Sequence, residues 1–415
     1  MNHRLLCLAL AAGVGVLIGA GSVRAAEPLT LQAAVERALG ANPGLRAAAT
    51  DVAAHEGAIA QAGALPNPEL ELLREGRERT DRTSTVQLGI PIELGGKRAA
   101  RVDAARSSAE VATASLEAQR AQVRADTVAA FYDAVASAEA QRLSGELAEL
   151  AERASMAAQR RVDTGKASPL EATRARVAQA NARIDAVQAG RDLASARIRL
   201  AAMWGGDPGS LAIAAPGAIA LPDAPPLAQL TARLESAPAL RRARAGIAHR
   251  AAQARVERAR RVPDVTLIVG TQRESTQERV DGGRRAVLGL SVPLPLFNRN
   301  EGAMLESLRR VDQAREEAAA EQVRLRSELA QAHARLLAAH EEAQLIENEV
   351  APGAEQAWQA ARRGYELGKF GLLEVLDAQR TLRQARHQYL KAVAEAYRAM
   401  ADIERLVGPW TQETP

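Results

Sequence analysis

Acidic side chains follow two glycine residues at the same distance in this sequence. Glu171 lies six positions after Gly165, and Glu374 lies six positions after Gly368, with Asp377 one helical turn further on. In a symmetric assembly, carboxylates that face a shared axis form a ring, and such rings favour cations. The spacing therefore fits a cation-selective constriction. Acids in the first turn of a helix also stabilise the helix dipole, which is the alternative explanation for all three.

Other residues with possible chemistry are better explained by structure. His333 and His340 are seven positions apart and share a helix face, but no third ligand lies at the spacing of a metal site. The pairs Gly165-Lys166 and Gly368-Lys369 lack the further glycines of a phosphate-binding loop and fit the turn of a helical hairpin. We therefore predict no catalytic residue, no cofactor and no metal site, and hence no enzyme.

The composition favours long, closely packed helices. Only 2% of the 415 residues are aromatic, and the hydrophobic 47% is carried largely by alanine. The net charge of +4 is spread over 25% charged residues, with acids and bases interleaved along most of the chain. A nucleic-acid-binding protein would show a basic block or interleaved aromatic residues, so we predict no nucleic acid as a partner.

Residues 1–25 have the pattern of a secretory signal peptide. A basic Arg4 precedes an uncharged run from Leu5 to Val23, and Ala25 offers a small residue at the cleavage site. An uncleaved anchor helix is the alternative, because 18 or more apolar residues can span a bilayer. The only cysteine, Cys7, lies inside this segment, so the mature chain is expected to contain no disulfide.

The remainder of the chain is an internal duplication with a shift of about 195 to 203 positions. Leu88-Gly89-Ile90-Pro91-Ile92 aligns with Leu290-Ser291-Val292-Pro293-Leu294, and Gly165-Lys166 aligns with Gly368-Lys369. We therefore predict a first repeat over residues 26–215, a second repeat over 216–408 and a C-terminal tail over 409–415.

Each repeat is predicted to contain the same elements in the same order. A short helix comes first, followed by two strands around a polar loop, a very long helix, a glycine-centred turn and another long helix. Alternating apolar residues, as in Val86, Leu88 and Ile90, mark the strands. The predicted short helices are 29–63 and 226–261, the strands are 68–75, 83–93, 264–273 and 285–295, and the long helices are 96–163, 168–203, 300–365 and 370–407.

Heptad spacing in the long helices predicts coiled-coil packing. Leu382, Tyr389, Ala396 and Ile403 recur every seven residues, and the residues three places later are Ala385, Ala392, Ala399 and Leu406. No proline interrupts 97–161, which allows a helix of roughly 100 Å. The predicted fold class is mostly α with a small β part: duplicated long-helix coiled-coil hairpins plus four strands per chain. A periplasmic coiled-coil scaffold without a membrane barrel is the alternative from another functional class.

Four strands are too few to close a membrane barrel, and open strand edges in lipid leave backbone groups without partners. Chains must therefore pool their strands. Two chains would supply eight strands, whose interior side chains fill, whereas three would supply twelve and leave room for a channel. The strand count consequently predicts a homotrimer.

The two strand-to-helix segments, 92–98 and 293–300, and the duplicated order of elements make the chain resemble the TolC-like outer-membrane factors. The segments Ile92-Glu93-Leu94-Gly95-Gly96-Lys97-Arg98 and Pro293-Leu294-Pro295-Leu296-Phe297-Asn298-Arg299-Asn300 resemble the branch that serves heavy-metal and cation efflux pumps. This resemblance implies a trimeric 12-stranded β-barrel in outer-membrane lipid, continued into the periplasm as an α-helical tunnel. It also implies docking on a periplasmic adaptor protein and an inner-membrane pump of the RND type.

The same resemblance suggests roles for individual residues. Glu374, Asp377 and Glu171 resemble the acidic constriction at the periplasmic mouth, and Tyr365 resembles the gate tyrosine. The turns at Gly165, Lys166, Gly368 and Lys369 are the expected adaptor-docking tips. The sequence departs from the family pattern at Phe370, where some members carry an arginine that helps to lock the gate.

The resulting prediction is a passive exit duct in the outer membrane for heavy-metal or cation efflux. A duct for type I protein secretion or for drug efflux would use the same fold with a different pump. The exported substrate is not readable from the duct, because selection occurs mainly in the pump.

Overall fold

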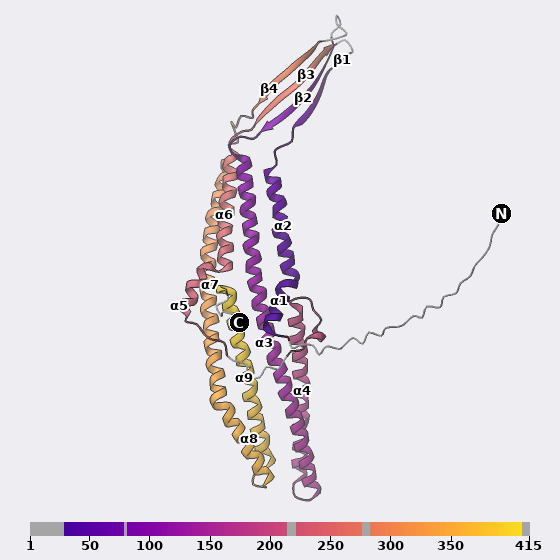
Figure 1. Cartoon of the computed structure of the whole chain (residues 1–415), viewed down its shortest axis with the longest axis vertical. Helices are drawn as coiled ribbons and strands as arrows, with labels where there is room; N and C mark the ends of the chain where they lie inside the picture. The colour runs from indigo at the N-terminus through magenta and orange to yellow at the C-terminus, as the bar shows by residue number, and fades with distance from the viewer. Residues whose placement is uncertain (1–28, 79–80, 214–220, 276–282, 409–415) are drawn as a thin grey trace, which may run out of the picture.

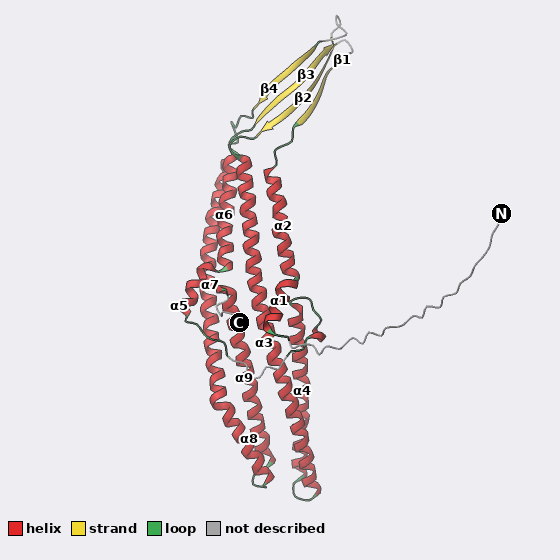
Figure 2. Cartoon of the chain, in the orientation of Figure 1, coloured by secondary structure: helices red, strands yellow, loops and turns green. Residues whose placement is uncertain are grey.

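In the computed structural model the chain is a long rod with a β-sheet at one end and helical hairpins at the other (Figure 1). The structure describes residues 29–78, 81–213, 221–275 and 283–408. The predicted signal peptide over 1–25 and the tail over 409–415 lie outside these residues. Figure 2 shows that helices make up the whole rod below the sheet. The predicted fold class, mostly α with a small four-stranded part, is confirmed.

The first predicted short helix, 29–63, is wrong as a single element. The structure has two helices, α1 (Leu31–Ala41) and α2 (Pro43–Gly63), separated at Asn42. A residue before proline is pushed out of the helical conformation, so Pro43 begins a new helix instead of continuing the first. The side chain of Asn42 stabilises the break, because its carboxamide accepts from the backbone N–H of Leu45 at 3.1 Å and donates to the carbonyl of Met203 at 2.8 Å.

The second predicted short helix, 226–261, is divided for the same reason. It consists of α5 (Leu227–Arg233), a 3₁₀ turn (η2, Leu234–Ser236) and α6 (Pro238–Ala259). Ala237, which precedes Pro238, has φ −53° and ψ 135°, outside the helical region. A further 3₁₀ turn, η1 (Pro208–Ser210), follows the first hairpin.

The four strands form one antiparallel sheet in chain order. They are β1 (Glu69–Glu78), β2 (Asp81–Ile92), β3 (Val265–Ser275) and β4 (Arg284–Ser291). The repeats therefore meet where β2 pairs with β3, with Ile90 opposite Leu267. The prediction of a fourth strand reaching 295 is wrong, because Pro293 and Pro295 have no N–H to donate to a sheet.

One face of this sheet is apolar and the other is mostly polar. A row of directly opposed residues crosses all four strands as Leu70, Leu88, Val269 and Leu288. All four side chains are exposed in the single chain, Leu288 to 79%. A row on the opposite face, three positions further along, begins at Leu73 and continues through Thr85, Gln272 and Arg285. The apolar face is therefore a large surface without a partner in the isolated chain.

The long helices form two hairpins. The first is α3 (Lys97–Asp163) with α4 (Pro169–Ala202), and the second is α7 (Glu301–Leu345), η3 (Ile346–Val350) and α8 (Ala351–Glu366) with α9 (Leu372–Val407). At 67 residues, α3 is about 100 Å long. Within the described residues, no helix is both long and apolar enough to cross a membrane.

The predicted helix over 300–365 is not a regular α-helix throughout, because the five residues of η3 are π-helical. Pro352 has no N–H, and its ring would clash with the carbonyl four residues earlier in an α-helix. The wider turn avoids that clash, and the N–H of Ala351 bonds to the carbonyl of Ile346, five residues back. The corresponding part of α3 contains no proline and remains α-helical.

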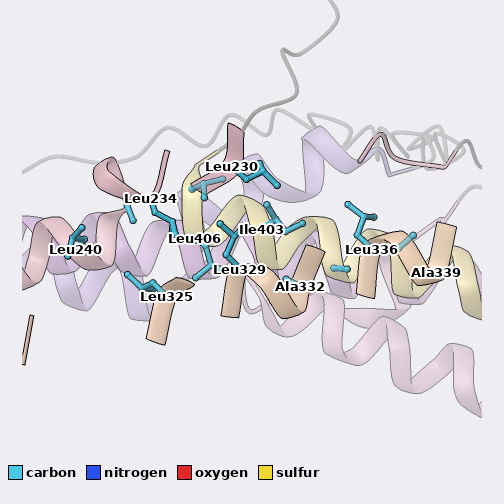
Figure 3. Packing of buried hydrophobic residues seen from close by; sticks show 14 residues of the cluster. Leu230, Leu234, Leu240, Leu325, Leu329, Ala332, Leu336, Ala339, Ile403 and Leu406 are labelled. Carbon is cyan, nitrogen blue, oxygen red and sulfur yellow. The ribbon is translucent and has the colours of Figure 1, made fainter. Parts of the chain in front are cut away.

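Small side chains and leucines pack the helices together. The coiled-coil seam expected in the last helix is confirmed, because Leu382, Ala396 and Ile403 are buried, as are most of the alanines beside them. A larger core lies near the middle of the rod, where α5, α6, α7 and α9 meet (Figure 3). Leu336 and Ile403 are fully buried there, and each contributes about 1.5–3 kcal/mol by leaving water.

Candidate functional site

The two hairpin turns lie together at the end of the rod opposite the sheet (Figure 1). Gly165 and Gly368 have φ values of +72° and +74°, a left-handed conformation that costs glycine nothing. In each turn the following lysine donates its N–H to a carbonyl five residues back, 2.8 Å for Lys166 to Arg161 and 2.7 Å for Lys369 to Gly364. The duplicated sequence thus builds the same helix C-cap twice, and both lysines are exposed.

The predicted acids begin the helices that leave these turns. Glu171 lies in the first turn of α4, and Glu374 lies in the first turn of α9. Asp377 follows Glu374 by three residues, so the two carboxylates are neighbours on one helix face. Glu374 and Asp377 are exposed and form no ion pair within the described part of the chain.

Tyr365 and Glu171 join the two hairpins. The hydroxyl of Tyr365, in the last turn of α8, donates to the Oε1 atom of Glu171 at 3.0 Å. The guanidinium carbon of Arg161 lies 4.6 Å from the centre of the Tyr365 ring, within range of a cation–π interaction. Ala158 and Ala175 are buried beside them, and Tyr365 and Leu376 pack against that pair. The structure therefore brings two of the four predicted gate residues into direct contact.

The surroundings of Tyr365 favour its neutral hydroxyl. Burial has the largest effect and raises the pKa of Tyr365 above its ordinary value, and the hydrogen bond to Glu171 raises it further. Arg161 opposes this shift in pKa because its positive charge would stabilise a tyrosinate. The hydroxyl therefore remains a donor to Glu171 across the physiological pH range.

Phe370, where the sequence departs from the family pattern, has a structural role within one hairpin. A Cβ atom added to Gly364 would lie 2.1 Å from Cδ2 of Phe370, so the ring lies directly against the glycine backbone. The N–H of Phe370 also points to the carbonyl of Gly364 at 3.3 Å. The Phe370 ring thus packs against the Gly364 backbone and closes the second turn. Phe370 therefore acts within its own hairpin, whereas Tyr365 contacts the other hairpin.

Sequence reasoning missed Arg161, Gly364 and a second bridge between the hairpins. Arg383 of α9 donates to Asp185 of α4. Both residues line a cavity of about 980 Å³ between the two hairpins. The repeat alignment places Arg161 opposite Gly364, with the shift of 203 that relates the two turns. A long cationic side chain in one repeat aligned with a glycine in the other was the signal from which different roles for Arg161 and Gly364 could have been predicted. No local pattern pairs Arg383 with Asp185.

The structure describes little that could hold a metal ion. Among the described residues, no group of three or more His, Cys, Asp and Glu side chains lies at metal-binding distances. His333 is half-buried, and its Nε2 atom lies 2.9 Å from the carbonyl oxygen of Pro225, in the segment before α5. Its position is explained by this contact with the chain.

Comparison with known proteins identifies the family. The sequence matches the outer membrane efflux protein family over residues 34–206 and 230–409. It is 42% identical to the cobalt-zinc-cadmium resistance protein CzcC of Cupriavidus metallidurans, over 92% of this chain and 91% of that protein. It is 30% identical to the nickel-cobalt-cadmium resistance protein NccC of Alcaligenes xylosoxydans xylosoxydans, over 72% of this chain and 68% of that one.

A solved structure has the same fold. The outer membrane protein VceC of Vibrio cholerae superposes with a TM-score of 0.74 at 21% identity, over 91% of this chain and 96% of VceC. The predicted resemblance to the heavy-metal branch of the TolC-like proteins is confirmed by these matches. The chain belongs to the outer membrane efflux protein family.

Proposed function

We propose that this chain is the outer-membrane exit duct of a tripartite efflux system for heavy-metal cations. The observation that carries the proposal is the 42% identity to a cobalt-zinc-cadmium resistance protein along nearly the whole chain. The duct is a passive conduit, and we assign it no catalytic residue. Metal selection then belongs to the pump.

The sheet has the properties of a barrel segment in a membrane. Its strands are 8 to 12 residues long, and about 9–11 residues cross a bilayer when tilted by about 45°. The apolar row from Leu70 to Leu288 would face lipid, while the row from Thr85 to Arg285 would face water in the lumen. This arrangement also explains why large apolar side chains are exposed in the single chain.

A homotrimer completes this barrel. The sheet has the order β1-β2-β3-β4, so β1 and β4 present unpaired edges in the single chain. Unpaired backbone groups cost several kcal/mol each in lipid, and three copies would pair β4 of one chain with β1 of the next. Twelve strands leave an open channel, which a passive duct requires.

The opposite end of the rod is the proposed periplasmic gate. The link between Tyr365 and Glu171 holds the two hairpins of one chain together. Three-fold symmetry would arrange Glu374 and Asp377 as rings of carboxylates around the axis, which favours cations. These acids are exposed and unpaired in the described chain, as groups that face a water-filled pore would be.

The hairpin turns are the proposed docking tips for the adaptor. Lys166 and Lys369 are exposed beside Gly165 and Gly368, and both turns lie at the end farthest from the sheet (Figure 1). An adaptor that reaches from an inner-membrane RND-type pump would meet this end first. Engagement of the tips would pull on the same hairpins that Tyr365 and Glu171 join.

Deletion of the gene and complementation test the proposed function. Loss of the duct is expected to lower tolerance to cobalt, zinc or cadmium salts, and the wild-type gene should restore it. A heat-stable trimer in the outer-membrane fraction is expected from the complemented cells. Unchanged tolerance to all three metals together with failed export of a protein would instead assign the duct to type I secretion.

A further inference from the structure

The helix ends next to the sheet carry most of the net positive charge of the chain. Segments 93–101, 255–264 and 299–310 are the junctions between strands and helices, and together they contain ten Lys or Arg residues and five Asp or Glu residues. Their net charge of +5 exceeds the +4 of the whole chain, so all the other residues together are close to neutral. We refer to these three segments as the junction band.

Four of the five acids of the junction band form ion pairs with described residues, and Glu301 is the exception. Lys97 contacts Asp264 at 2.7 Å, and Arg260 contacts Glu257 at 2.7 Å, while Arg101 pairs with Glu93. These pairs leave other guanidinium groups of the band without a carboxylate.

Besides Arg98, which donates to the carbonyl of Gly63, and Arg255, those groups are Arg258, Arg261 and Arg299. All three are exposed, and none forms an ion pair with a described residue. Arg258 is in the last turn of α6, and Arg299 lies just before α7 begins. Three unpaired guanidinium groups at one level of the rod form a cationic surface, and a guanidinium binds phosphate oxygens with two parallel hydrogen bonds.

The apolar face of the sheet continues up to the junction band. Val292, Leu294, Leu296 and Phe297 follow β4, and all are exposed, with Phe297 fully so. Apolar side chains next to cationic ones fit the boundary between acyl chains and headgroups, because aromatic and basic residues are both favoured at that boundary. A nucleic acid or an acidic protein would not account for the exposed leucines and phenylalanine.

We propose that the junction band binds the phosphate groups of anionic glycerophospholipids in the membrane leaflet that faces the helices. Arg258, Arg261 and Arg299 contact the headgroups, while Leu296 and Phe297 lie among the acyl chains. This inference rests on the proposed function, because it requires the sheet to span the membrane. The band then sets the depth of the duct in the membrane.

Lipid retention by the purified trimer tests the contact. Native mass spectrometry after incubation with phosphatidylglycerol or with phosphatidylethanolamine is expected to show preferential retention of the anionic lipid. Arg258→Gln, Arg261→Gln and Arg299→Gln together should weaken that retention about tenfold or more, since each cation near a headgroup adds to binding. The matched control is Arg174→Gln, Arg363→Gln and Arg380→Gln, which removes the same charge from the hairpin end and should leave retention unchanged.

Two outcomes would overturn the lipid assignment. Equal loss of phosphatidylglycerol from both triple variants would show that total charge matters and the band does not. Selective retention of lipopolysaccharide over phosphatidylglycerol would place the phosphate ligand in the opposite leaflet. Trimer assembly and conductance are measured on the same samples, so that a wild-type chain which neither assembles nor conducts would refute the proposed function separately.

A fluorescence measurement tests the depth of the band in intact protein. Phe297→Trp places an indole two residues before the segment 299–310 of the band, and phospholipids brominated high on their acyl chains are expected to quench its emission. Phe370→Trp places an indole at the hairpin end, where no quenching beyond that of the wild-type protein is expected. Equal quenching of the two variants would contradict the proposed position of Phe297 in lipid.

Discussion

The Tyr365 hydroxyl and the Glu171 carboxylate, 194 residues apart in the chain, meet at 3.0 Å where the two helical hairpins end. They occupy different places in their repeats, since Tyr365 precedes its glycine turn and Glu171 follows its own. The link is therefore asymmetric and joins the outgoing helix of one hairpin to the incoming helix of the other. Arg161 covers the Tyr365 ring from the first hairpin. Together these contacts make Tyr365 the centre of the connection.

Removal of the Tyr365 hydroxyl should loosen the closed mouth. Tyr365→Phe keeps the ring that Arg161 covers but loses the hydrogen bond to Glu171, worth about 1 kcal/mol at a half-buried site. The ratio of closed to open states should fall roughly fivefold per chain, and single-channel recordings in planar bilayers should show longer openings. Tyr389→Phe is the control, because its half-buried hydroxyl lies away from the hairpin ends. Identical open times in all three proteins would exclude the link as part of the gate.

The gate should respond to alkaline pH through Tyr365. Its pKa is raised in the folded chain, so the folded state holds the proton more tightly than the unfolded state. The contribution of Tyr365 to the stability of the folded chain is complete below the ordinary tyrosine pKa of about 10. That contribution is lost as the pH rises through the raised pKa of the folded chain. Conductance should consequently rise above about pH 10 in the wild-type protein and not in Tyr365→Phe. The same alkaline response in both proteins would assign it to another group.

The acids of α9 should determine ion selectivity. Glu374→Ala with Asp377→Ala removes up to six carboxylates from a trimer, which should widen the closed mouth and lower the preference for cations. Reversal potentials in a salt gradient measure the selectivity, and native mass measurement shows that the trimer still forms. Glu347→Ala with Glu349→Ala, both exposed in η3, is the control of equal charge. Unchanged reversal potentials in the α9 variant would falsify the ring and leave both acids as helix-start residues.

The hairpin turns should contact the adaptor in cells. Cysteines at Lys166 and Lys369 are expected to crosslink to adaptor hairpins, because both lysines are exposed at the end opposite the sheet. A cysteine at Glu75 in β1 is the control and should not crosslink. Crosslinks from Glu75 alone would reverse the orientation of the chain.

Because of the contact between Phe370 and Gly364, replacing this helical glycine by alanine should destabilise the second turn, whereas such a change normally stabilises a helix. Alanine normally stabilises a helix relative to glycine by about 1 kcal/mol, yet a Cβ at Gly364 would overlap the Phe370 ring. Gly364→Ala should therefore increase proteolysis at the second turn, and adding Phe370→Ala should restore resistance. Gly353→Ala, where nothing lies near the added carbon, should raise resistance slightly. Increased resistance in Gly364→Ala alone would refute the packing.

Local patterns in the sequence determined most of the elements. The strand through Val86, Leu88 and Ile90 alternates apolar and polar residues, the last long helix repeats an apolar position every seven residues, and each hairpin turn contains a glycine followed by lysine. These signals depend on neighbours only a few positions apart. They also predicted that both turns lie at one end and the strands at the other. The divisions at Asn42 and Ala237 were available in principle, because Pro43 and Pro238 follow them.

The π-helical turn is an intermediate case. Pro352 lies within an otherwise regular heptad pattern, and such a proline can end, kink or widen a helix. Here it widens the helix over Ile346–Val350, with Ile346 buried. The choice among these outcomes depends on how α7 and α8 pack against α9, which no local pattern reports.

Only the tertiary structure decided which side chains meet between the hairpins. Tyr365 with Glu171 and Arg383 with Asp185 are pairs from opposite repeats, separated by 194 and 198 positions. The heptad pattern shows which face of each helix is buried, but it does not set the rotation and height of one hairpin against the other. Those follow from the packing of long helices whose small side chains allow several close registers. The sequence therefore identified the acids and the tyrosine as candidates, and packing alone selected Glu171 as the partner of Tyr365.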